Sequence, residues 1–391
     1  MSRSRRVGAV VVGGDYQGLG IARSLGRVGV PVVVLDDEMS ISRVSRYVSR
    51  FERVPDLLEP RAALAALTRL GRTLGDERWV LYPTREETVA LVARNREELA
   101  RWFRLPTPSF DVVRVAWDKR ETYQRAEALG VPVPRCWFPA SEADLDTVDL
   151  SGPVVLKPAI KEHFVYATKV KAWRADTSQE LRTTYRRARE VVPADEIIVQ
   201  ELVPGDGAAQ LAFCALYTDR GPTAEMTVRR LRQHPSDFGR ASTFVETIEM
   251  PELGELADRL LHSIGYRGLV EVEFKLDARD GRPKLLDINA RTWGYHTLGC
   301  AAGVDFSSLL FRDQLGEELA RVRARPGVRW IRLETDVPNA CRDIWRGRLG
   351  LRDYLRSLRG VDTEAVFTRE DPLPSLLELG LAPYLAVRRG L

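Results

Sequence analysis

Apolar residues in the first third of the chain form short continuous runs separated by stretches with helical spacing. The runs at 7–13 (VGAVVVG) and 31–36 (PVVVLD) predict buried strands, and a helix is predicted between them. A helix at 60–71 and a strand at 79–82 continue the alternation. Strands that alternate with helices pair in parallel, because each helix carries the chain back across the sheet. We therefore predict an α/β domain over residues 1–112.

The pattern changes after a segment at 105–117, which carries two prolines and shows no helical periodicity. Asp118 then starts a predicted helix, with Glu121 placed as in a capping box, and Gly130 ends it. Further strands are predicted at 153–158, 168–173, 197–203, 210–217 and 223–230, and helices at 178–190 and 252–264. The tail from about 331 is rich in arginine and partly helical.

Composition excludes several classes of protein. The net charge is only +4 and arginine is spread along the chain, so no nucleic-acid partner is expected. The four cysteines show no C-x-x-C spacing, which argues against a zinc site or a disulfide framework. No apolar run reaches the length of a membrane span, and we expect a cytoplasmic protein without a membrane partner.

The most informative stretch is EVEFKLDARDGRPKLLDINAR at 271–291, which predicts two strands joined by a turn. Side chains alternate along a strand, so Glu273 should face Asp287, Asn289 and Arg291 on one side of this hairpin. Acids and an amide are oxygen ligands for Mg²⁺, and arginine suits phosphate or carboxylate. Taken alone, the solvated face of a surface hairpin explains the pattern equally well.

Other motifs are weak one by one. Lys119 in a first helical turn and Lys157 at a strand end suit phosphate, yet each is more often a surface lysine. Residues 197–206 (IIVQELVPGD) form a strand and a turn with two acids. The glycine loop at 13–20, with Asp36 at the end of the next strand, could bind a dinucleotide or a substrate anion, but a tight strand-to-helix turn is favoured.

Taken together, DK…GVPVP, LKP, QELVPGD and VEF…DIN-R resemble the ATP-grasp superfamily over about residues 7–310, and the domain at 1–112 resembles its Rossmann-like pre-ATP-grasp domain. The whole chain is most similar to the predicted carboxylate–amine ligase branch. The resemblance implies a two-lobed ATP-grasp domain at 113–330 and a C-terminal extension at 331–391. Its lobes would be a small one at about 118–200 and a large one at about 201–330.

The same resemblance implies ATP and Mg²⁺ as cofactors and assigns a role to each motif. Arg291 and Lys157 would be catalytic. Lys119 and Lys157 would contact phosphate. Gln200, Glu201, Leu202 and Val203 would meet adenine, and Asp206 would bind ribose. Glu273, Asp287 and Asn289 would hold Mg²⁺, and Arg291 would contact the transferred phosphate.

The implied activity is ligation of a small-molecule carboxylate to an amine through an acyl phosphate, by a possible homodimer. The alternatives are a carboxylase of the same superfamily, with or without biotin, a non-catalytic ATP-binding regulator, and a nicotinamide-dependent oxidoreductase. The first glycine loop alone supports the last of these.

Three further features bear on this expectation. Residues 159–171 lack the glycines of many relatives' phosphate flap and carry Lys161, His163, Lys169 and Lys171 instead. The basic cluster of Arg229, Arg230 and Arg232 could hold an acidic substrate or be a solvated face. Trp293 and His296 could line the pocket, although packing roles are more common.

Overall fold

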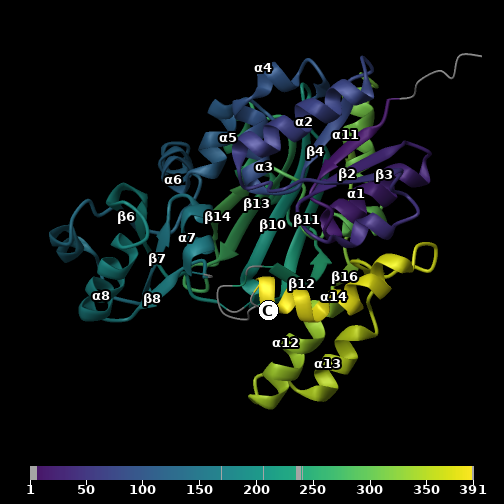
Figure 1. Ribbon diagram of the computed structural model, residues 1–391. Helices are drawn as coiled ribbons and strands as arrows, with labels where there is room; N and C mark the ends of the chain where they lie inside the picture. Colours follow the sequence, from purple (N-terminus) through teal and green to yellow (C-terminus); the bar gives the residue numbers. More distant parts are fainter. Residues whose placement is uncertain (1–6, 169, 206, 235–238, 240, 390–391) are drawn as a thin grey trace, which may run out of the picture.

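The computed structural model describes residues 7–168, 170–205, 207–234, 239 and 241–389. Its elements form three sheets and a C-terminal group of helices (Figure 1). The first sheet is parallel, with strand order β3-β2-β1-β4-β5. Its strands are β1 (Ala9–Val12), β2 (Val32–Asp36), β3 (Arg50–Arg53), β4 (Trp79–Pro83) and β5 (Phe103–Arg104); the helices are α1 (Tyr16–Arg27), α2 (Pro60–Leu74), α3 (Glu86–Arg94) and α4 (Arg96–Leu99), with a 3-10 turn at Ile41–Val44.

The glycine loop between β1 and α1 is a tight turn. The Gly14 amide donates to Asp36 Oδ2 at 2.6 Å, and Arg85 Nη2 donates to Asp36 Oδ1 at 2.9 Å. Gly13 has φ of +100°, and a Cβ there would lie 2.2 Å from Thr84 Oγ1. The Asp36 carboxylate is thus committed to the protein, which favours the turn over a ribose site.

The second sheet is small, with strand order β6-β9-β7-β8. Its strands are β6 (Cys136–Trp137), β7 (Val154–Pro158), β8 (Trp173–Ala175) and β9 (Ile197–Glu201), and the helices packed on it are α7 (Lys161–Thr168) and α8 (Ser178–Arg189), with 3-10 turns at Ala143–Thr147 and Ala194–Glu196. The preceding helices α5 (Phe110–Trp117) and α6 (Lys119–Ala128) pack on β14 (Pro283–Asn289) of the third sheet instead.

Three local predictions here are wrong. The segment at 105–117 ends in a helix, α5, because Val113 and Ala116 are one turn apart and both are buried. The strand predicted at 168–173 overlaps the observed strand β8 only at Trp173. Thr168 instead ends α7, a helix whose Phe164 is buried. Asp118 does cap α6, accepting from the Arg120 amide at 2.9 Å, but Glu121 pairs with Arg114 rather than completing a capping box.

The third sheet is the largest, with strand order β14-β13-β10-β11-β12-β16-β17 and β15 beside β11. Its strands are β10 (Gln210–Thr218), β11 (Gly221–His234), β12 (Ala241–Thr247), β13 (Gly268–Leu276), β14 (Pro283–Asn289), β15 (Val322–Arg323), β16 (Arg329–Ile331) and β17 (Thr363–Glu364); its helices are α9 (Pro251–Ser263), α10 (Thr297–Ala301) and α11 (Phe306–Gln314), with a 3-10 turn at Gly207–Ala209. The extension predicted at 331–391 thus contributes β17 to this sheet.

Side chains of β10 alternate between two apolar cores, one on each face of the large sheet. Leu211 and Phe213 belong to a core with α9, whereas Ala212 and Cys214 belong to one with α1 and α11. Because the first domain packs on this second face, the large sheet is covered on both sides. This mixed α/β architecture confirms the predicted fold class.

The chain ends in α12 (Leu333–Trp345), α13 (Leu351–Leu358) and α14 (Leu373–Arg389). Two buried ion pairs fasten this group to the rest of the molecule. Arg232 donates to both carboxylate oxygens of Asp336 at 2.8 Å, and Arg23 Nε donates to Asp371 at 2.9 Å. In the described part of the chain, every helix is too short or too polar to cross a bilayer.

Candidate active site

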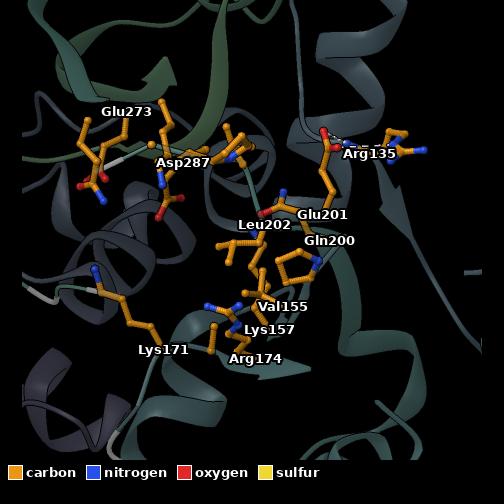
Figure 2. Close-up of a pocket in the computed structure, with 18 of the residues that line it drawn as sticks. Arg135, Val155, Lys157, Lys171, Arg174, Gln200, Glu201, Leu202, Glu273 and Asp287 are labelled. Carbon is orange, nitrogen blue, oxygen red and sulfur yellow. Dashed lines mark hydrogen bonds and ion pairs between the residues drawn. The ribbon is translucent and has the colours of Figure 1, made fainter. Parts of the chain in front are cut away.

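A cavity of about 870 Å³ lies between the small sheet and the large sheet. In Figure 2, Glu273 and Asp287 lie together on one side of it, and Gln200, Glu201 and Leu202 lie on the other. A volume of this size is typical of sites for small molecules and cofactors. Of the residues assigned roles from the sequence, those that line it are Lys119, Lys157, Gln200, Glu201, Leu202, Val203, Glu273 and Asp287.

The end of β9 forms one wall, and hydrogen bonds fix its orientation. The Glu201 carboxylate is turned away from the open cavity: it accepts from the Arg135 amide at 3.1 Å and from Lys284 Nζ at 3.0 Å. Burial alone would raise the pKa of Glu201, but these hydrogen bonds and that of Arg279 hold it below its usual value. The carboxylate therefore stays charged and positions the strand end.

The backbone beyond Glu201 presents a free donor. The Leu202 amide donates to the Pro153 carbonyl at 2.9 Å, so it is already committed. Among the described residues, none accepts a hydrogen bond from the Val203 amide. Of the four residues that the sequence placed against adenine, Val203 has the amide that a base edge could use.

The two lysines enter the cavity from α6 and β7 and lie in different electrostatic surroundings. Lys119 Nζ donates to Asp287 Oδ1 at 2.6 Å, which joins the small sheet's side of the cavity to the large sheet's. Lys157 Nζ contacts the Tyr123 hydroxyl at 2.5 Å, and no carboxylate among the described residues lies within ion-pair distance of it. Burial lowers the pKa of Lys157 to about 8. An anionic ligand would raise this pKa again and favour the charged form.

The β13–β14 hairpin forms as the alternating pattern predicts. Glu273 pairs with Asp287 and Glu271 with Asn289 across the two strands, so all four side chains share a face. Val272 and Ile288, on the other face, are buried against α9. The predicted polar face is therefore at a cavity wall and is not a solvated surface.

The carboxylates of this face already attract cations. Arg230 Nη2 lies 2.9 Å from Glu273 Oε1, and Lys119 neutralises Asp287. Two carboxylates at one end of a cavity fit a hard cation such as Mg²⁺, which is usually held by one or two carboxylates plus substrate phosphates. In the described chain there is no group of three or more acids, histidines or cysteines arranged as a complete metal cage.

Asn289 and Arg291 lie beside this wall but do not line the cavity. The Asn289 amide nitrogen donates to Glu271 and Glu273 at 3.0 Å each, and its oxygen accepts from Arg291 Nη2 at 3.3 Å. Arg291 Nε donates to Glu86 of α3 at 2.8 Å. To bind a metal through its oxygen, Asn289 would have to rotate its side-chain amide. To contact phosphate, Arg291 would have to release Glu86.

The neighbouring Glu271 is buried under Glu273. It accepts from the Tyr295 hydroxyl, and Arg230 Nη2 lies 3.8 Å away. Burial, followed by repulsion from Glu273, raises the pKa of Glu271 to about 7. Two acids this close are costly to ionise together, so a cation near Glu273 is favoured.

The three clustered arginines separate in space. Arg230 is buried in the cavity wall, donating from Nη1 to Gln210 at 2.9 Å. Arg229 is exposed, and Arg232 is fixed by Asp336. Of the three, Arg230 is the one that can meet a substrate.

Two aromatic candidates have packing roles. Trp293 is fully buried and meets Phe306 edge to face with ring centroids 4.8 Å apart. His296 is buried against α1, where a Cβ on Gly20 would lie 2.6 Å from its Nε2. Burial lowers the pKa of His296 to about 4. Neither Trp293 nor His296 lines the cavity.

Lys171 and His163, from the segment at 159–171, have different partners. Lys171 lines the cavity and donates to the Gly239 carbonyl of the large lobe at 2.9 Å. His163 Nδ1 instead lies 2.7 Å from Glu196. Asp206 and Lys169, named from the sequence, lie outside the described residues, as does the side chain of Lys161.

Sequence reasoning did not identify Tyr123 or Glu86. Tyr123 lies on the buried face of α6 and gives no local signal, yet its hydroxyl contacts Lys157 and donates to the Leu286 carbonyl at 2.7 Å. Glu86 looks like an ordinary first-turn acid of a helix. Only the packing of the first domain on the hairpin brings it to Arg291.

The cavity between the two sheets has lysines on one side and carboxylates on the other, an arrangement that suits a polyphosphate with its metal ion. Residues 217–335 match a family described as "ATP-grasp in the biosynthetic pathway with Ter operon". The chain is 24% identical over 301 residues to a D-aspartate ligase of Enterococcus faecium (strain Aus0004), covering 72% of this chain and 70% of that protein.

Two solved structures share the fold. An L-amino acid ligase from Bacillus licheniformis has a TM-score of 0.62 and 17% identity, with 80% of this chain and 75% of that chain covered. The biotin carboxylase domain of the Hydrogenobacter thermophilus 2-oxoglutarate carboxylase, in complex with MgADP, ADP and bicarbonate, has a TM-score of 0.66 and 15% identity, with 82% and 73% covered. The family model, the relative and the shared fold together confirm the resemblance to the ATP-grasp superfamily and its carboxylate–amine ligase branch that was seen in the sequence.

Proposed function

We propose that the protein is an ATP-dependent ligase that joins a small-molecule carboxylate to an amine through an acyl phosphate, releasing ADP and phosphate. The ligase class follows from its family. The observation that supports this proposal is the composition of the cavity. Lys119 and Lys157 line it together with Glu273 and Asp287, and the Val203 amide beside them has no acceptor among the described residues. A triphosphate needs cations along its length and a donor for its base, and this cavity supplies both.

Nucleotide binding would exchange existing contacts for new ones. Lys119 exchanges Asp287 for phosphate oxygens, and a phosphate beside Lys157 raises the pKa of that lysine and keeps it charged. The Val203 amide pairs with the adenine edge. Asp36, which a dinucleotide would need for its ribose, remains occupied by Gly14 and Arg85, so the oxidoreductase alternative lacks a site.

Glu273 and Asp287 would hold Mg²⁺, with Asn289 as a third ligand if its amide turns over. Bound Mg²⁺ supplies Lewis-acid neutralisation of the phosphate oxygens. Arg230, released from Glu273 when a metal takes that carboxylate, is then placed to hold the substrate's own carboxylate. Glu86 keeps Arg291 close to the hairpin until a phosphoryl group competes for it.

The chemistry needs no protein nucleophile. A carboxylate oxygen of the substrate attacks the γ-phosphorus, and the bond to ADP breaks. The amine nitrogen then attacks the acyl carbon, the bond to phosphate breaks, and the nitrogen loses a proton. The chain's contribution is positioning and charge neutralisation, which is the main source of catalysis in phosphoryl transfer.

ADP release tests this proposal, with acids and amines varied independently. Because relatives are named D-aspartate ligase and L-amino acid ligase, the first panel is D-aspartate and the common L-amino acids, with bicarbonate as a separate arm. With ¹⁸O-labelled carboxylate, label should be found in the released phosphate. AMP and pyrophosphate as products would exclude the acyl phosphate. Turnover with bicarbonate alone would favour a carboxylase, and ATP binding without turnover would favour a regulator.

A further inference from the structure

The C-terminal helices carry an apolar surface that the proposed reaction does not use. Among the described residues, nine of the thirteen large apolar side chains that are exposed to solvent lie after residue 331, and five of these nine are on α12 and α13. In Figure 1, α12 and α13 project away from the three sheets as a helical pair, drawn in yellow-green. Exposed apolar side chains concentrated on a projecting element mark an interaction surface more often than chance exposure does.

The apolar positions are aligned along α12. Leu333, Val337, Cys341 and Trp345 follow one another at intervals of four, and all are exposed. Residues four apart lie on the same side of a helix. Trp345, at the helix end, is 86% exposed.

A similar arrangement is found on α13. Leu351 and Leu355 are one turn apart and are 57% and 51% exposed. Tyr354, which lies between them in the sequence, instead packs inward, with Arg232 5.1 Å from its ring centre. The helix therefore has one anchored side and one apolar side that faces solvent.

Arginines accompany both apolar rows. Arg342 and Arg346 follow the α12 row by one residue, and Arg352 and Arg356 follow the α13 row by one residue. One residue is about 100° of rotation, so each row of arginines flanks a row of apolar side chains. All four arginines are exposed. Their stems can lie along apolar surface while their guanidinium groups stay in water.

The charge of this segment distinguishes between possible occupants. Residues 341–360 contain six arginines and two aspartates, a net charge of +4, which equals the net charge of the entire chain. The rest of the protein therefore carries equal numbers of positive and negative side chains. Two copies meeting through this surface would bring like charges together, whereas an anionic surface would complement it.

We propose that α12 and α13 form a docking surface for anionic phospholipid, with Trp345, Leu351 and Leu355 at the headgroup boundary and the flanking arginines on lipid phosphates. Helices that lie on membranes combine an apolar row with basic flanks, and tryptophan favours the interfacial region. The sequence argument against a membrane partner concerned only a spanning segment. Surface docking needs no such segment, and the Arg232–Asp336 pair keeps the surface formed in the free protein.

Vesicle flotation of the full chain tests this proposal. Wild-type protein should float with phosphatidylcholine vesicles that contain about 30% phosphatidylglycerol, should remain unbound with phosphatidylcholine alone, and should be released by salt. Trp345→Ser combined with Leu355→Gln should abolish flotation. Both side chains are exposed and neither lines the cavity, so folding and ADP release should be unchanged.

A matched pair of triple variants separates this surface from general charge. Arg342→Gln, Arg346→Gln and Arg352→Gln together should reduce the partition coefficient on the order of a hundredfold, since each basic residue near an anionic surface contributes about 1 kcal/mol, or roughly fivefold. The control triple, Arg61→Gln, Arg69→Gln and Arg125→Gln, removes the same charge from exposed positions on α2 and α6 and should change it little.

Three results would overturn the proposal. One is absence of wild-type flotation with anionic vesicles. Another is equal loss in the two triple variants, which would indicate non-specific attraction. The third is a wild-type dimer in light scattering that Trp345→Ser converts to a monomer, because the surface would then be an interface between copies.

Discussion

The low pKa of Lys157 predicts that ATP affinity depends on pH in the alkaline range. Burial disfavours the ammonium form and lowers its pKa from 10.5 to about 8, and Tyr123 is a neutral partner. If phosphate binds the charged form, the dissociation constant should rise by roughly tenfold between about pH 7 and pH 9, because about one tenth of Lys157 remains charged one unit above its pKa. Binding should also take up protons between about pH 8 and the ordinary lysine value.

Calorimetry of ATP binding in buffers of different ionisation enthalpy measures both effects. Lys157→Arg is the control, since a guanidinium stays charged throughout this range and should bind with little pH dependence. The free protein gives a second check. A depressed lysine pKa means that the unfolded chain binds more protons, so this group's contribution to stability rises as pH increases from about 8 to about 10.5. Wild-type affinity that is flat over the range, or a decline equally large in Lys157→Arg, would refute the reasoning.

Three other predictions follow from the site and its supports. Glu273→Gln and Asp287→Asn should each abolish ADP release with the fold retained by circular dichroism, a loss of several kcal/mol of transition-state stabilisation; near-normal turnover would show that the wrong acids were chosen. Arg291→Lys should lower kcat far more than it weakens ATP binding, because an ammonium cannot meet two phosphoryl oxygens; equal losses in both would assign Arg291 to ground-state binding. Asp336→Ala should destabilise the protein by about 3–5 kcal/mol in urea unfolding, since it leaves Arg232 without its bidentate partner, whereas breaking an exposed pair on α13 should cost under about 1 kcal/mol.

Some features were determined by local sequence alone. The continuous apolar runs specify β1 and β2, because a strand covered on both faces needs apolar residues at every position. The alternation around Glu273 and Asp287 specifies the polar face of the hairpin, because the side-chain period of a strand is two. Order and spacing of the motifs then sufficed to recognise the superfamily.

The partners of each polar side chain were decided only by the tertiary structure. Lys119 meets Asp287 across 168 residues, and Arg291 meets Glu86 across 205. Arg230 and Arg232 have the same local pattern, yet one enters the cavity and the other fastens α12. The physical reason is that periodicity fixes which face of an element a side chain occupies, whereas the packing of three sheets decides what that face meets.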